Sequence, residues 1–265
     1  MRTPSPGEDV VNDFDLAGRR VLVTGGGDGL GRQFVTALVE AGAEAVICGR
    51  REAPLEETRE ALTASGGRVE VIVADVTNDD DRVRLASAAG DIDVLVNNAG
   101  VSSRARWDAV VLDDWRYIMN LNVEAPFRLI QLLAPGMVER GFGRIVNISS
   151  IYGLVAGDPS RYPGHGLDIG SYFASKHALI GLTKSLAVDL GGTGVTVNAV
   201  APAVIETPML GKVDAAHVAY MRSKIPMERF GTVEEVAALI CWIASRECSF
   251  STGTVFDISG GRATY

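Results

Sequence analysis

The sequence predicts an α/β fold in one domain: a doubly wound parallel β-sheet of about seven strands, flanked by helices. Three observations support this prediction. Short apolar segments alternate with helical segments along the chain, no repeat or low-complexity linker divides it, and 47% of its 265 residues are hydrophobic. A chain of this length and composition can bury one full core, and a second core is not needed.

The apolar segments indicate where the strands begin and end. We expect strands near residues 19–24, 44–48, 69–74, 92–97, 143–149, 194–200 and 254–258. Helical patterns are clearest at about 30–40, 112–137 and 171–190. Strands that alternate with helices form a parallel sheet covered on both faces, and ligands of such sheets lie beyond the carboxyl ends of the strands.

The first strand runs directly into a glycine-rich turn that precedes the helix at 30–40. Gly25, Gly29 and Gly31 follow Thr24 in the spacing Thr-Gly-x-x-x-Gly-x-Gly. In a strand, glycine turn and helix of this kind, backbone N–H groups and the helix N-terminus receive a diphosphate. The spacing differs from the common Gly-x-Gly-x-x-Gly fingerprint, so a plain glycine turn is the alternative for this segment taken alone.

The second strand is followed by Gly49, Arg50 and Arg51, and this end of the strand selects between two dinucleotides. An acidic residue here hydrogen-bonds the ribose 2′-OH of NAD, whereas a cation pairs with the 2′-phosphate of NADP. Arg50 is placed to hold that phosphate through its planar guanidinium, although the charge of Asp28 in the glycine turn would repel it. The sequence therefore favours NADP(H), with NAD(H) possible and a solvated Arg50 as the alternative.

A phenol and an ammonium stand four residues apart in the helix expected at 171–190. At this spacing Tyr172 and Lys176 leave the same helix face. A free tyrosine titrates near ~10, but a nearby cation favours the phenolate, so Tyr172 could exchange a proton at working pH. The pair therefore predicts a general acid and base.

Five signatures occur in one order along the chain. They are Thr24-Gly25-x-x-x-Gly29-x-Gly31, Asn97-Asn98-Ala99-Gly100, Asn122, Ser150 and Tyr172-x-x-x-Lys176. Over roughly residues 16–261 the chain resembles the compact branch of the short-chain dehydrogenase/reductases, such as 3-oxoacyl reductases and gluconate dehydrogenases. The resemblance implies a Rossmann-type fold and an NAD(P)-dependent oxidoreductase that interconverts a secondary alcohol and a ketone by hydride transfer.

The resemblance also implies a role for each signature residue. Tyr172 would exchange the proton with the substrate oxygen, and Lys176 would lower the pKa of Tyr172 and bind the nicotinamide ribose. Ser150 would hydrogen-bond the substrate oxygen, and Asn122 would hold a water that continues the proton path. The residues expected to bind the cofactor are Gly25, Asp28, Gly29, Leu30, Gly31, Arg50, Asp75, Val76, Asn98, Ala99, Gly100, Tyr172, Lys176, Pro202, Ile205 and Thr207.

Charge and composition argue against other classes of partner. A formal net charge of −8 disfavours nucleic acid and an anionic membrane, so a small alcohol or ketone is the expected partner. Cys48, Cys241 and Cys248 form no Cys-x-x-Cys pair, which predicts core thiols and no metal site. No apolar run approaches the ~20 residues that cross a bilayer, and the polar start lacks a secretion signal. We therefore expect a cytoplasmic protein.

Domain boundaries and assembly follow from the same reading. We expect a flexible leader at residues 1–14 and a catalytic domain at 15–265 that includes a lid at 203–231. The resemblance implies that the helices at 112–137 and 171–190 pair between subunits of a homotetramer.

Two departures from the family pattern leave the substrate open. Ser150 and Tyr172 lie farther apart than is usual, so residues 157–168 form an inserted loop beside the active site that could select the substrate. Ala203 stands where relatives usually carry glycine. A sugar or polyol, a β-ketoacyl thioester and an alicyclic ketone all fit this reading. A non-catalytic dinucleotide sensor or scaffold is the alternative function.

Overall fold

The computed structural model describes residues 14–102, 108–156, 170–206 and 214–264. Within them, seven strands form one sheet in the order β3-β2-β1-β4-β5-β6-β7, and every neighbouring pair is parallel. This confirms the predicted doubly wound fold. The strands are β1 (Arg20–Thr24), β2 (Glu44–Gly49), β3 (Arg68–Val73), β4 (Val94–Asn97), β5 (Gly143–Ile148), β6 (Val195–Pro202) and β7 (Val255–Ile258).

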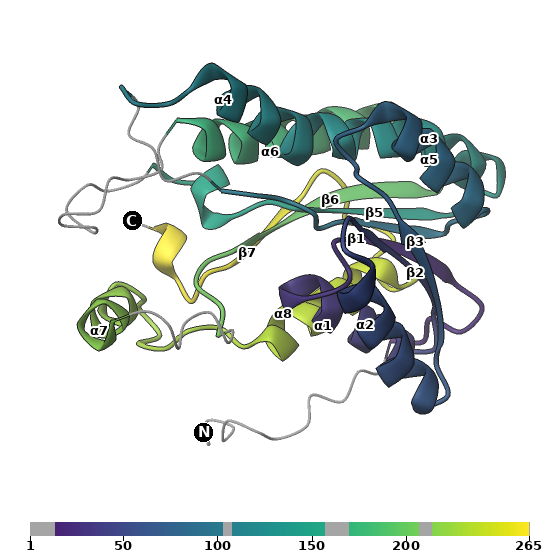
Figure 1. The fold of residues 1–265 in the computed structure, drawn as a ribbon, viewed down its shortest axis with the longest axis horizontal. Coiled ribbons are helices and arrows are strands. Elements are labelled where there is room, and N and C mark those ends of the chain that lie inside the picture. The colour runs from purple at the N-terminus through teal and green to yellow at the C-terminus, as the bar shows by residue number, and fades with distance from the viewer. Residues whose placement is uncertain (1–13, 103–107, 157–169, 207–213, 265) are drawn as a thin grey trace.

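Helices cover both faces of the sheet (Figure 1). One face carries α1 (Gly29–Glu40), α2 (Glu52–Ala64) and α8 (Val233–Ala244). The opposite face carries α3 (Asp79–Ala89), α4 (Leu112–Met119), α5 (Ala125–Glu139) and α6 (Ser171–Asp189). Another helix, α7 (Ala215–Ser223), lies to the side of these layers. Among the residues described, none of the helices combines the length and the apolar character that a membrane span needs.

Alternation along the strands supplies a separate core to each face. In β1, Val21 and Val23 pack with Phe34 of α1, whereas Leu22 between them packs with Leu129 of α5. Successive side chains of a strand point to opposite faces, so a strand buried on both sides is a continuous apolar run. The apolar runs in the sequence therefore located the strands to within a few residues.

The strand order reverses at β1, which lies between β2 and β4. Crossover helices leave to opposite faces at such a switch point, and a crevice opens beyond the carboxyl ends of the strands there. The glycine turn after β1 and the Asn98 loop after β4 both lie at this point. The fold thus brings together the motifs that the sequence places at strand ends.

The prediction of one continuous α-helix at 112–137 is wrong, because the α-helix is interrupted. Residues Asn120–Glu124 form a π-helix, η1, between α4 and α5. Single π-helical turns inside α-helices frequently occur at functional sites, and here the turn contains Asn122. The inserted loop at 157–168 and nearly all of the expected leader at 1–14 lie outside the described residues.

Candidate active site

The glycine turn between β1 and α1 is shaped for a ligand that backbone atoms must approach closely. Gly25 and Gly29 have positive φ angles of 69° and 53°, a region that favours glycine. A Cβ on Gly31 would lie 2.0 Å from the carbonyl oxygen of Gly25, so a side chain has no room there. The first N–H groups of α1 have no partner within the helix and are available to an anion. These residues fit the diphosphate of a dinucleotide.

Hydrogen bonds around Thr24 tie the ends of β1 and β4 together. Its Oγ1 accepts from the backbone N–H of Asn98 at 3.0 Å and from that of Ala99 at 2.9 Å. The amide Nδ2 of Asn98 in turn donates to the carbonyl oxygen of Thr24 at 2.9 Å. Thr24 was missing from the predicted site residues, although it is the first residue of the glycine signature.

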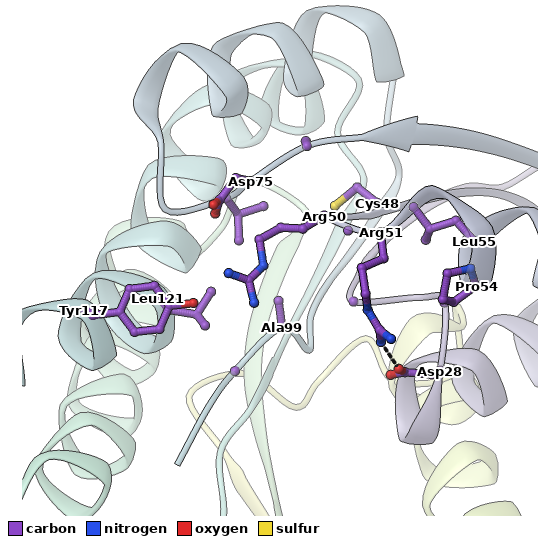
Figure 2. Close-up of a pocket in the computed structure, with 16 residues that line it drawn as sticks. Asp28, Cys48, Arg50, Arg51, Pro54, Leu55, Asp75, Ala99, Tyr117 and Leu121 are labelled. Carbon is purple, nitrogen blue, oxygen red and sulfur yellow. Dashed lines mark hydrogen bonds and ion pairs between the residues drawn. The ribbon is translucent and has the colours of Figure 1, made fainter. Parts of the chain in front are cut away.

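A cavity of about 260 Å³ opens at the ends of β1, β2 and β3 (Figure 2). Arg50 leaves the end of β2 and points into this cavity, toward Ala99. Among the residues described, no carboxylate forms an ion pair with Arg50. The predicted cofactor residues that line the cavity are Gly25, Asp28, Arg50, Asp75, Val76, Ala99 and Gly100. Tyr117 and Leu121 line it as well, and no sequence motif indicated them.

Asp28, whose negative charge would repel the 2′-phosphate of NADP, forms an ion pair in the structure. Its carboxylate forms an ion pair with the guanidinium of Arg51 beside the cavity (Figure 2). Sequence reasoning missed this partner, although Arg51 is the neighbour of Arg50. The two side chains are 68% and 71% exposed, so solvent screens the pair and it adds little to stability. Its consequence is local, because the negative charge of Asp28 at the cavity is compensated.

Tyr172 and Lys176 lie one turn apart on α6. The Lys176 Nζ lies 5.6 Å from the centroid of the Tyr172 ring and donates a hydrogen bond to the carbonyl oxygen of Ile148 at 2.7 Å. Lys176 is only 4% exposed. This burial lowers the pKa of its ammonium to about 8, because removal from water disfavours the charged form. The lysine charge therefore changes close to the working pH.

Asn122 is fixed in the π-helix by hydrogen bonds from both ends of its amide. Its Oδ1 accepts from the N–H of Val101 at 3.0 Å, and its Nδ2 donates to the carbonyl oxygen of Val101 at 2.9 Å. Nδ2 also donates to Oγ of Ser175 at 3.0 Å, and that hydroxyl donates to the carbonyl oxygen of Tyr172. Ser175 joins Asn122 to the helix of the tyrosine, and no sequence motif pointed to it.

Ser150 lies just after β5 and caps a short 3₁₀-helix, η2 (Ile151–Gly153), where its Oγ accepts from the N–H of Tyr152 at 3.2 Å. Gly153 lets this segment contact α6. A Cβ there would lie 2.6 Å from Oγ of Ser149 and 2.8 Å from the carbonyl oxygen of Lys176. The absence of a side chain at this position therefore brings Ser150 beside the helix of Tyr172.

A second cavity, of about 250 Å³, lies at the ends of β4, β5 and β6. Gly100 lines both cavities, so they adjoin. Asn122 lies behind the wall that Gly100 forms. The predicted residues that line the second cavity are Leu30, Asn98, Gly100, Ser150, Tyr172, Lys176 and Pro202.

Four predicted cofactor residues do not line either cavity in the described structure: Gly29, Gly31, Ile205 and Thr207. Gly29 and Gly31 lie in the glycine turn itself, next to Asp28 and Leu30, which do line the cavities. Ile205 is buried in the core beneath α8 and forms an isolated bridge with Gly231. Thr207 lies outside the described residues, as does 207–213 of the expected lid. The rest of the set surrounds two adjoining spaces. One space has a cation for a phosphate, and the other has a phenol, a hydroxyl and an ammonium that can move a proton and bind an oxygen.

Comparison with known proteins agrees with this geometry. The model of the short chain dehydrogenase family matches residues 19–217. The chain belongs to this family. It is an NAD(P)-dependent oxidoreductase that acts on CH–OH groups, as the sequence predicts, and nothing supports the non-catalytic sensor or scaffold.

Similar proteins cover almost the whole chain. A 2-dehydro-3-deoxy-L-rhamnonate dehydrogenase (NAD(+)) of Sphingomonas sp. strain SKA58 is 38% identical, over 94% of this chain and 97% of its own. A 3-oxoacyl-(acyl-carrier-protein) reductase of Thermotoga maritima is 36% identical, over 93% and 98%. The crystal structure of a gluconate 5-dehydrogenase from Burkholderia cenocepacia J2315, in complex with NADP and tartrate, is 32% identical, with a TM-score of 0.87 over 96% and 98%.

Proposed function

We propose that this protein is an NADP(H)-dependent dehydrogenase that interconverts a secondary hydroxyl and a ketone on a sugar acid. The observation that carries the proposal is the juxtaposition of two cavities around Gly100. One receives Arg50, and the other is lined by Ser150, Tyr172 and Lys176. Such a pair of spaces suits a dinucleotide that reaches from a phosphate site to a proton-exchanging site.

The preference for NADP(H) is supported by residues of this chain. The relatives differ in their cofactors, since one is named for NAD(+) and another was crystallised with NADP. Here β2 is followed by Arg50, where an NAD-specific site carries a carboxylate. Asp28, the acidic residue that argues against a phosphate, is neutralised by Arg51. Arg50, which points into the cavity, therefore favours a 2′-phosphate.

The proposed reaction assigns one task to each residue of the second cavity. NADP(H), when bound, supplies or accepts the hydride. Tyr172 gives its phenolic proton to the substrate oxygen in reduction and removes a proton from the alcohol in oxidation, while the charge of Lys176 stabilises the phenolate. Ser150 hydrogen-bonds the substrate oxygen as charge develops on it.

Asn122 is proposed to hold a water that replenishes the proton of Tyr172 by way of Lys176. The space for such a path exists because residue 100 is glycine. A Cβ at Gly100 would lie 3.2 Å from Oδ1 of Asn122 and 3.5 Å from Nζ of Lys176. A side chain here would thus occupy the gap between the two polar groups.

A sugar acid is favoured by the relatives and by a buried cation that bonds Tyr152, the ring next to Tyr172. Arg262, in η5 (Arg262–Thr264), is 2% exposed, and its Nη2 donates to the hydroxyl of Tyr152 at 3.4 Å. The rings of Tyr152 and Tyr172 lie 6.5 Å apart, centroid to centroid. Arg262 lines neither cavity, so its charge would act on a substrate from behind Tyr152 and not by direct contact. A positive charge on this side of Tyr172 favours an anionic substrate, and the carboxylate of gluconate is of this kind.

The proposal is tested by measuring kcat/KM for gluconate and for the neutral polyol of equal chain length with both cofactors. We expect the acid to exceed the polyol by about tenfold or more, because the polyol lacks the negative charge that the guanidinium of Arg262 attracts. Arg262→Gln should reduce this ratio and spare the polyol. A higher efficiency on a 3-oxoacyl thioester than on any sugar acid would contradict the proposal.

Assembly and location also belong to the proposal. We expect a homotetramer in which α5 and α6 pair between subunits. Apolar side chains on these helices reach solvent in the single chain, among them Phe127 and Val138 on α5 and Val188 on α6, which is 80% exposed. Light scattering that gives the mass of one 28.1 kDa chain would contradict the tetramer. A cytoplasmic location stays a prediction of the sequence.

A further inference from the structure

Arg82 is a buried cation that lines neither cavity. It lies on α3 and is 2% exposed. Its Nε donates to the carbonyl oxygen of Val76 at 2.5 Å, and its Nη1 donates to Oε1 of Glu124 at 3.0 Å. Its Nη2 donates to Oδ1 of Asn120. Burying a guanidinium is costly unless its donors are satisfied, and here they are satisfied by two separate segments of the chain.

Asn120 forms a second link between the same two segments. Its Nδ2 donates to the carbonyl oxygen of Thr77 at 2.9 Å while its Oδ1 accepts from Arg82. Val76 and Thr77 belong to the loop after β3, and Val76 lines the first cavity. Asn120 and Glu124 are the first and last residues of the π-helix. Arg82 therefore contacts both ends of the π-helix and the loop of the cofactor cavity at once.

Two neighbouring residues of the π-helix, Leu121 and Asn122, lie next to different cavities. Leu121 lines the first cavity (Figure 2). Asn122, the next residue, bonds Val101 and Ser175 behind the second cavity. A π-helical turn contains one residue more than an α-helical turn and is rarely favoured by the backbone alone. Side chains that fix both of its ends therefore determine where the amide of Asn122 lies.

We propose that Arg82 and Asn120 are positioning residues that keep the π-helix in the register that Asn122 needs. They link this register to the adenosine end of the cofactor cavity. The proposal rests on the proposed function, because it takes Asn122 as part of the proton path and the first cavity as the cofactor site. Loosening the link should reduce turnover through Asn122 and cofactor affinity through Val76 together.

The first experiment compares Asn120→Ala, Arg82→Lys and Arg82→Met with Arg140→Met. Arg140 is a matched control, because it also joins a helix end to a loop but bonds Asp91 and the carbonyl oxygen of Ile92, which line neither cavity. We expect the Asn120 and Arg82 variants to bind NADPH more weakly in a fluorescence titration. Without cofactor, their backbone amides at 119–125 and at Val101 should exchange hydrogen faster. The control should match the wild type, and exchange rates at 119–125 that are unchanged in Asn120→Ala would overturn the proposal.

The second experiment is a double-mutant cycle on kcat. Asn120→Ala alone should lower kcat by about tenfold or more, since small displacements of a positioned group have large effects. In an Asn122→Ala background it should have almost no further effect, because it acts through Asn122. Losses that add, or an Asn120→Ala enzyme that melts earlier but keeps its kcat, would show a merely structural role.

The failure of the proposed function is distinguishable from the failure of this inference. An Asn122→Ala enzyme with the kcat of the wild type would contradict the role of Asn122 in the proton path. The exchange measurement would still report whether Arg82 and Asn120 hold the π-helix, since it requires no turnover.

Discussion

The two adjoining cavities differ in how their charges meet the solvent. In the first cavity three of the four charged side chains, Asp28, Arg50 and Arg51, are exposed, and Asp28 and Arg51 pair with most of their surface in water. In the second cavity the charge belongs to Lys176, which is 4% exposed, and the groups around it are hydroxyls, amides and carbonyl oxygens. Exposed charges are screened and act nearly independently, whereas buried polar groups depend on one another.

This difference predicts how substitutions in each cavity affect binding and catalysis. Replacing an exposed residue of the first cavity should alter which dinucleotide binds and leave the chemistry intact. Replacing a buried residue of the second cavity should remove the reaction, because no solvent can take over its contacts. The comparison would be contradicted if variants of the first cavity removed the reaction, or if variants of the second cavity changed only which dinucleotide binds.

The largest effect is expected from Tyr172→Phe, which removes the phenolic proton and little else. We expect kcat to fall by about a thousandfold, within the range for loss of a general acid or base. The Kd for NADPH should hardly change, since the aromatic ring remains. Steady-state kinetics and a fluorescence titration check both numbers. A variant that retains more than a tenth of the activity would remove Tyr172 from the role of acid and base.

The next effect is a pH profile set by Lys176. Below a pKa of about 8 the ammonium is charged and stabilises the phenolate of Tyr172, and above this pH the charge is lost. Rising pH helps Tyr172 to act as a base, so kcat for oxidation should increase toward about pH 8 and then level off. In Lys176→Arg the guanidinium stays charged, and the increase should continue to higher pH.

Two profiles would contradict this account of the lysine. One is a flat kcat from neutral to alkaline pH in the wild type. The other is a profile of Lys176→Arg that levels off at the same pH as the wild type. Lys176→Met provides the reference for complete loss of the charge and should impair both turnover and cofactor binding.

Much of the fold and of the second cavity could be predicted from the sequence, because these features depend on residues that are close together in the chain. Tyr172 and Lys176 share a helix face by their separation alone, and buried strands appear as apolar runs. Gly31 could be read as a position with no room for a side chain, because the glycine spacing implies a tight strand-to-helix turn.

The rest depends on contacts between residues far apart in the chain. The ion pair of Asp28 with Arg51 joins two turns, and Arg82 reaches Asn120 across 38 positions. Neither pairing has a periodicity or spacing that a single sequence displays. The π-helix was missed for the same reason, since its ends are fixed by Arg82 and by the loop after β3, not by helix propensity.

A smaller effect, on specificity alone, is expected from Arg50→Asp. The change removes the partner of a 2′-phosphate and supplies an acceptor for a ribose 2′-OH. The ratio of kcat/KM for NADP to that for NAD should fall by about tenfold or more, with kcat on the better cofactor retained. Arg116→Asp, an exposed arginine on α4, is the control and should leave the ratio unchanged. A wild-type enzyme that already prefers NAD would show that Asp28 outweighs Arg50.

The smallest effect is expected at Asp28, the exposed acid beside the first cavity. Asp28→Asn removes a negative charge near the proposed phosphate site and releases Arg51 from its ion pair. Both consequences favour NADP, so its Kd should decrease by about twofold to fivefold at low salt, in line with the small energies of screened surface charges. The Kd for NAD, which lacks the phosphate, should stay the same. Raising the salt should abolish the difference between variant and wild type, because the charges are exposed. The melting temperature should barely move, and a loss of several degrees, or weaker NADP binding, would show that the pair shapes the glycine turn instead of tuning its charge.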